Sequence, residues 1–256
     1  MNRVVAALRL AGLELLVRRR RILALLAFSA VALAVAATAA ALGREAGHVE
    51  IGTLFALGGY PLVSGILLVG WLLGRFPLAA TLVLMSGVVA ADRAAGHDRL
   101  LAVRPVHPAL VYGARAAVLG SLALLLSALL LPLFDLIMLG RWGGPATIVL
   151  ILAHVLVWGG LTAFFSVHTG LDAWIVLLLA LAAMVWTGLN QAGMVPLVGP
   201  LADLVEFVLP PQRQLFALES AFAGVEPIPW AAFWFCAGYG GLAFLLAGWT
   251  LGRRER

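Results

Sequence analysis

The chain has 256 residues, of which 63% are hydrophobic and 11% charged, whereas soluble domains carry roughly 45–50% apolar and about 25% charged residues. This composition excludes a water-soluble globular domain and predicts an all-α integral membrane protein, with a single transmembrane domain over residues 1–256. The net charge is +5, and all seventeen basic residues other than histidine are arginine. Without lysine the chain has no P-loop and no lysine Schiff-base chemistry.

Residues 1–21 predict an amphipathic helix that lies in the membrane interface. On a helical wheel, Arg3, Glu14, Arg18 and Arg21 fall within roughly 60° of one another, and most other positions are apolar. The alternative is the basic start of a signal peptide. The apolar run Ile22–Leu42 is longer than the roughly 7–15 residues of a signal sequence, so we interpret it as the first membrane span.

Residues 51–91 are mostly apolar but are interrupted by Pro61 and by Pro77. Arginine-rich stretches lie before the first span and after residue 91, and the positive-inside rule places both on one side of the membrane. Residues 51–91 must therefore cross once, which predicts a second span at Leu72–Ala91. The segment 51–70 would then be re-entrant or interfacial, and the pattern does not choose between these. Arg75 must reach the outer interface or face protein.

Four more apolar runs predict the remaining spans, which gives six transmembrane helices in all. Residues 190–229 form a long outer segment in which Pro210 and Pro211 separate two short predicted helices. The four spans are Ala109–Phe134, Pro145–Phe165, Ala173–Leu189 and Trp230–Leu251.

The arginine distribution predicts the orientation of the chain. Thirteen of the seventeen arginines lie at 3–21, 93–115 and 253–256, all on the same predicted side. We therefore expect a multi-pass protein of the inner (cytoplasmic) membrane with both termini in the cytoplasm.

The cytoplasmic segment 92–108 joins the second and third spans and is too polar to lie in lipid. It predicts a short helix at His97–Val103, which Pro105 and Pro108 end before the third span begins. A charged elbow joined to two spans is suited to passing motion from a soluble partner into the membrane. An ordinary connecting loop is the alternative.

The segment resembles the cytoplasmic signature of ABC transporter permeases of the type-two, exporter-like family. That family has an acidic-Arg pair, a glycine, an apolar helix, and then a proline and a basic residue that open the next span. Its members also have an amphipathic N-terminal helix, six spans and short helices between the last two spans. The matching residues here are Asp92-Arg93, Gly96, Leu100-Leu101, Arg104-Pro105 and Arg115.

The resemblance implies a permease subunit that pairs with a second permease, identical or different, and is powered by a separate ATP-binding cassette ATPase. The chain itself is then no enzyme and holds no cofactor, its surroundings are the lipid bilayer, and no nucleic-acid partner is expected. The substrate is not implied. The residues implied to couple to the ATPase are Asp92, Arg93, Gly96, His97, Asp98, Arg99, Arg104 and Pro105.

His154 lies in the middle of the fourth span, where an ionisable group is a candidate for lining a translocation path. The alternative is a neutral histidine bonded to a neighbouring helix. Histidine and methionine show no metal-ligand spacing, so no metal site is expected. Two other functions stay open: a structural or assembly subunit of a larger membrane complex, and an intramembrane enzyme. The enzyme is disfavoured because polar residues do not gather at one membrane depth.

Overall fold

The structure, a computed structural model, describes residues 3–45, 74–97, 107–139, 142, 144–194, 204–205, 208–222 and 227–253. Throughout this part of the chain the regular structure is helical, as the composition predicts. The helices are α1 (Arg3–Val17), α2 (Arg19–Glu45), α5 (Phe76–Met85), α6 (Ala90–Ala94), α8 (Pro108–Leu139), α9 (Pro145–His168), α10 (Asp172–Gln191), α12 (Gln212–Phe222) and α13 (Trp230–Arg253).

Within the described residues, six stretches are long and apolar enough to span a membrane, and they coincide with the six predicted spans. They are formed by α2, by α5 and α6 together, and by α8, α9, α10 and α13. Prolines begin several of them: Pro108 and Pro145 start α8 and α9, where a missing backbone N–H costs nothing. The predicted re-entrant segment 51–70 lies outside the described residues.

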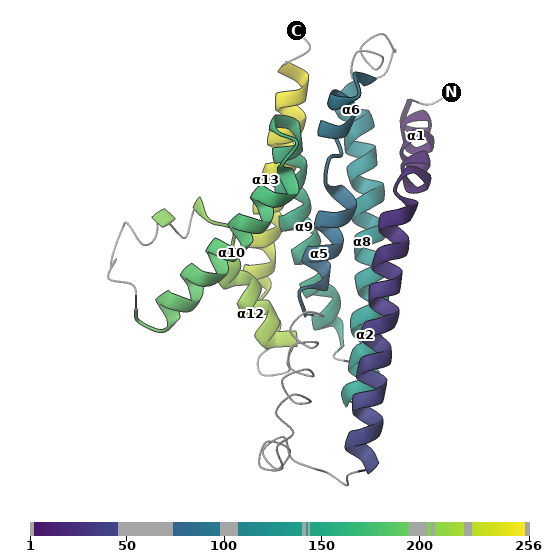
Figure 1. The fold of residues 1–256 in the computed structure, drawn as a ribbon. Helices are drawn as coiled ribbons and strands as arrows, with labels where there is room; N and C mark the ends of the chain where they lie inside the picture. The colour runs from purple at the N-terminus through teal and green to yellow at the C-terminus, as the bar shows by residue number, and fades with distance from the viewer. Residues whose placement is uncertain are drawn as a thin grey trace.

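The bundle has two distinct ends. α1, α6 and the C-terminal end of α13 lie at one end, and α2 runs from there to the other (Figure 1). A chain that crosses the membrane an even number of times begins and ends on the same side, and α1 and the end of α13 do lie at the same end of the bundle. α12 lies toward the opposite end, between the fifth and sixth spans as predicted, and α10 diverges from the bundle along its length (Figure 1).

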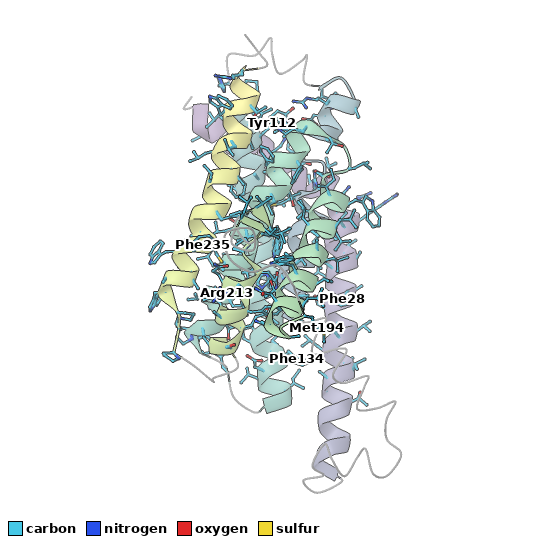
Figure 2. The ribbon with its side chains drawn as sticks, turned by 90° about the vertical axis from the view of Figure 1, so that its left-hand side faces the viewer. Phe28, Tyr112, Phe134, Met194, Arg213 and Phe235 are labelled. Atoms are coloured by element: carbon cyan, nitrogen blue, oxygen red, sulfur yellow. The ribbon has the colours of Figure 1, made fainter. Side chains whose placement is uncertain are left out.

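α9 is the centre of the bundle and contacts α5, α8, α10, α12 and α13. Its Trp158 is fully buried, in one hydrophobic cluster with Leu215 and Leu218 of α12. The outer surface is also apolar: Phe235 of α13 (Figure 2) and Leu23 and Val31 of α2 are exposed. A surface of this kind is stable only against lipid, which supports the membrane assignment.

α9 and α13 approach one another closely at two glycines. A Cβ atom on Gly160 would collide with the backbone of Gly240, and a Cβ atom on Gly240 would collide with the backbone of Leu156 and Val157. Glycine at both positions lets the backbones of α9 and α13 come into direct contact. Small residues at such crossings are typical of membrane helix interfaces.

The second span is not the continuous helix that the apolar run Leu72–Ala91 predicted. α5 ends at Met85, residues 86–89 form turns, and α6 begins at Ala90. Gly87 adopts a positive φ of 69°, which residues with a Cβ rarely adopt. We call residues 86–89 the break. A break inside a span exposes backbone polar groups, and these need partners within the protein.

Candidate functional site

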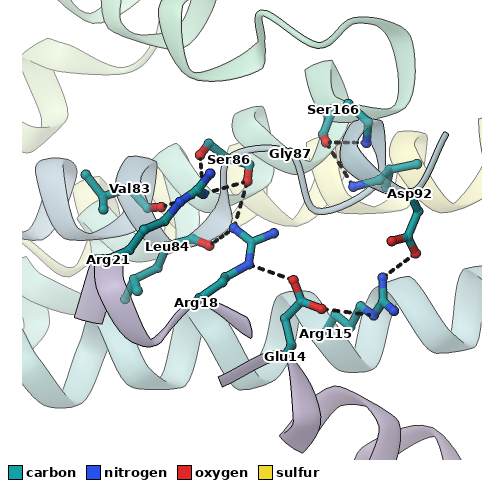
Figure 3. A network of polar contacts seen from close by, with 12 residues as sticks. Glu14, Arg18, Arg21, Val83, Leu84, Ser86, Gly87, Asp92, Arg115 and Ser166 are labelled. Atoms are coloured by element: carbon teal, nitrogen blue, oxygen red, sulfur yellow. Dashed lines mark hydrogen bonds and ion pairs between the residues drawn. The ribbon is translucent and has the colours of Figure 1, made fainter. Parts of the chain in front are cut away.

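Two arginines from the junction of α1 and α2 satisfy the carbonyl groups at the break (Figure 3). Arg18 donates from Nη1 to the carbonyl oxygens of Leu84 at 2.5 Å and Ser86 at 2.7 Å. Arg21 donates to the Val83 carbonyl at 3.1 Å and to the Ser86 hydroxyl at 2.8 Å. Charge-assisted bonds of this kind replace the helical bonds that end with α5.

Acceptors from two other helices satisfy the N–H groups of the break. The Asp172 carboxylate, at the start of α10, accepts a bond from the Gly87 N–H at 2.6 Å. The Ser166 hydroxyl of α9 accepts bonds from the N–H groups of Val89 at 3.0 Å and Ala90 at 3.2 Å. The break is therefore an ordered structure that side chains from three other helices hold in place.

We expect Ser166→Ala to lower the free energy of unfolding by about 2 kcal/mol, because two largely buried N–H groups lose their acceptor. Thermal unfolding of the purified protein in detergent measures the effect. Ser127→Ala is the matched control: Ser127 is also fully buried, but its hydroxyl has no hydrogen-bond partner, so its loss should cost almost nothing. Equal destabilisation by the two variants would contradict the role given to Ser166.

A chain of alternating charges links the break to the rest of this end of the bundle (Figure 3). Asp92 of α6 pairs with Arg115 of α8 at 2.5 Å, and Arg115 lies 3.7 Å from the Glu14 carboxylate of α1. Glu14 in turn pairs with Arg18 at 2.7 Å. All four side chains are at most 16% exposed, so solvent screens the pairs only partly. We call these four residues the charge chain.

The charge chain determines how α1 lies on the bundle. The amphipathic helix that residues 1–21 predicted is present, and it packs against α8. Its charged side, with Glu14 and Arg18, faces protein, and the large apolar side chains of Val5, Leu13 and Leu16 are exposed. This orientation suits contact with lipid on the exposed side. The sequence predicted the stripe of charges but not what it binds.

The structure describes four of the eight predicted coupling residues. Asp92 belongs to the charge chain, and Arg93 donates a hydrogen bond to the Val167 carbonyl of α9. Gly96 ends α6 with a positive φ of 72°, and the largely exposed His97 lies 3.9 Å from Asp92. The other four, Asp98, Arg99, Arg104 and Pro105, lie outside the described residues, as does most of the predicted helix His97–Val103.

A second polar cluster lies around His154, nearer the middle of the bundle. The His154 ring is fully buried, and its Nδ1 accepts a hydrogen bond from the indole N–H of Trp158 at 2.9 Å. Its Nε2 faces the Glu219 carboxylate of α12 at 3.7 Å, beyond hydrogen-bond distance. Because Nδ1 accepts, the neutral ring carries its proton on Nε2. Within one chain His154 thus lies in the packed core, and its predicted role in a path remains a prediction.

Arg75 completes this second cluster. It forms an ion pair with Glu219, and its guanidinium also lies 5.5 Å from the centre of the Phe216 ring. The sequence required Arg75 to reach the interface or face protein, and the structure shows that it faces protein. The partner was not predicted, because Glu219 lies 144 residues away and nothing in the local pattern indicates it.

Neither cluster resembles a metal or cofactor site. Among the residues that the structure describes, no three histidine, cysteine, aspartate or glutamate side chains gather closely enough to hold a metal ion. In both clusters the carboxylates form ion pairs with arginines instead.

No protein-family model, curated protein or solved structure matches the chain. Its function therefore has to be inferred from its own residues.

Proposed function

We propose that the chain is the membrane-spanning permease subunit of an ATP-driven ABC transporter, an exporter powered by a separate ATPase subunit. The observation that carries the proposal is the 92–115 signature, from Asp92-Arg93 to Arg115. The ion pair between its first and last residues supports it, because it ties the predicted coupling segment to the third span. Two such chains would pair in the membrane, each above one ATPase.

The charge chain suggests how movement would travel. An ATPase that pushed on the 92–108 segment would displace α6 and, through Asp92 and Arg115, also α8. Glu14 would pass the same displacement to α1, and Arg18 to the break. Buried ion pairs transmit displacement well because a lost partner leaves an uncompensated charge. The break would allow the two halves of the second span to move separately.

The orientation belongs to the same proposal. We place the chain in the inner (cytoplasmic) membrane with both termini in the cytoplasm. The support is the concentration of arginines at 3–21, 93–115 and 253–256. The end of the bundle that carries α1, α6 and the charge chain would then face the ATPase.

The test exchanges two charges in the coupling segment. In Asp98→Arg with Arg99→Asp the net charge of the loop is unchanged, so membrane orientation should be unaffected. We expect the co-purifying ATPase to fall at least about ten-fold, equal to 1.4 kcal/mol of binding. The measurement is a tagged pull-down from the native host in mild detergent, with quantitative mass spectrometry.

Arg44→Glu is the control, since it reverses an arginine near the far end of α2 and should leave the ATPase bound. An ATPase recovered equally with the exchanged and the unaltered protein would refute the coupling assignment. Recovery of a large membrane complex with no ATPase from the unaltered protein would refute the transport proposal. It would instead support the structural or assembly subunit.

A further inference from the structure

A cavity lies between α8, α9 and α13, directly beside the break. It has a volume of about 480 Å³, and none of its lining residues belongs to either polar cluster. Its walls are almost entirely apolar. The lining includes Met85, Val89, Ala117, Gly120, Phe244 and Gly248.

The cavity is long and narrow. On α8 its walls extend from Ala109 to Leu124, and on α9 from Leu152 to Val167. At 1.5 Å per residue each stretch is roughly 22 Å long. This volume is the space open to the centre of a water molecule, so over that length the cavity is a slot roughly 7–8 Å wide once the radius of water is added on each side. It is thus narrower than a helix, whose diameter is roughly 10–12 Å.

The slot opens toward the lipid-facing surface. Three small lining residues of α8, Gly113, Ala117 and Ser121, are exposed, and beside them Leu125 is 59% exposed. On the other wall, α13 carries the exposed Leu245 next to the cavity. The slot is therefore continuous with a surface that contacts bilayer hydrocarbon.

We infer that this slot binds one long, unbranched alkyl chain of an amphiphile from the bilayer. A partner helix is too wide, and a single side chain is too short to fill it. A polar ligand would find side-chain hydroxyls only at Tyr112 and Ser121, and the rest of the lining could not satisfy its hydrogen bonds. An alkyl chain has the required width, length and polarity, and filling the slot recovers dispersion contacts that an empty one lacks.

An alkyl chain bound in the slot would lie against the break. Met85, the last residue before the break, and Val88 and Val89, which belong to the break, all line the slot. An alkyl chain would thus contact the same segment that Arg18, Asp172 and Ser166 hold from the other elements. The inference does not depend on the transport proposal, because the slot belongs to the fold of one chain.

The test uses the purified full chain in phospholipid nanodiscs without any ATPase. The probe is a long-chain fatty acid that carries a diazirine midway along its chain. We expect light to cross-link it to peptides of α8 and α13 that line the slot. Gly248→Leu should reduce this labelling at least about ten-fold, or 1.4 kcal/mol, because its side chain would occupy the slot.

The space around Gly248 and Gly120 allows both substituted proteins to fold. A Cβ at Gly248 meets no atom within 4 Å, and one at Gly120 makes only ordinary contacts at 3.8 Å with Val155 and 3.9 Å with Met85. Gly120→Leu is therefore a second blocking variant. Gly238→Leu is the matched control on α13. A Cβ at Gly238 also meets no atom within 4 Å, but Gly238 does not line the slot. It should label like the unaltered chain.

Labelling that both blocking variants retain at full strength would overturn the inference, since it would come from lipid around the bundle. Absence of labelling on the slot peptides of the unaltered chain would also overturn it, because the slot would then be closed to the probe. Loss of ATPase binding in the separate pull-down would leave the labelling result unaffected. The two proposals can thus fail independently.

Discussion

Gly240→Val is expected to prevent the chain from reaching its folded state. A side chain at this position would have to share space with the backbone of Leu156 and Val157, which no rotamer change can relieve. α9 and α13 would separate, and the cluster that contains Trp158 and Cys236 would lose its packing. Overpacking costs about 1–3 kcal/mol when side chains can adjust. Here backbone must move, so we expect at least the upper end of that range.

The measurement is the yield of monodisperse protein after detergent extraction, followed by thermal unfolding of whatever is recovered. Gly241→Val is the matched control, because a Cβ at the next position meets no atom within 4 Å. It should give yield and unfolding close to those of the unaltered protein. If Gly240→Val were as stable as this control, the close contact between α9 and α13 would not exist in the folded protein.

The spans could be predicted because their signal is local. An uninterrupted apolar run is enough to indicate a span, and the predicted Trp230–Leu251 differs from the observed α13 by two residues at one end. Prolines at the first turn and arginines beyond the ends sharpened the boundaries. Pro145 was predicted to begin the fourth span, and it does.

The break in the second span could not be predicted, because residues far away in the sequence stabilise it. Ser86-Gly87 is a weak turn signal inside a run that is otherwise apolar. What decides the structure is Arg18, Ser166 and Asp172, which come from three other helices. A helix would satisfy the same backbone groups locally, so the preference appears only once those side chains are in place.

Distant packing also explains why the sequence indicated single residues of the two polar clusters but not which residues pair with one another. Asp92 and Arg115 were both singled out from the signature, but their pairing depends on how α6 meets α8. For Arg75 the sequence predicted only that it must reach the outer interface or face protein. Compensation could have come from any acidic residue, and the docking of α12 into the bundle selects Glu219. Rules on composition thus predict that a partner exists, and packing decides which one.

Arg75→Gln is expected to destabilise the protein by about 3 kcal/mol, because Glu219 keeps its charge and loses the arginine that compensates it. The estimate lies at the lower end for buried pairs, since the Glu219 side chain is 24% exposed and water screens part of the loss. Glu219→Gln should be similarly costly, with the uncompensated charge now on Arg75. Thermal and denaturant unfolding in detergent compare the variants.

The double variant Arg75→Gln with Glu219→Gln separates pairing from mere loss of side chains. Neither residue is then charged, and two amides can hydrogen-bond to one another, so the double variant should be more stable than either single variant. Arg20→Gln, at an exposed arginine of α2, is the control and should change stability by less than about 0.5 kcal/mol. Strictly additive losses would mean that Arg75 and Glu219 do not interact. α12 would then be held in the bundle by its buried apolar side chains, among them Leu215 and Leu218, which share a cluster with Leu78 and Leu82 of the second span.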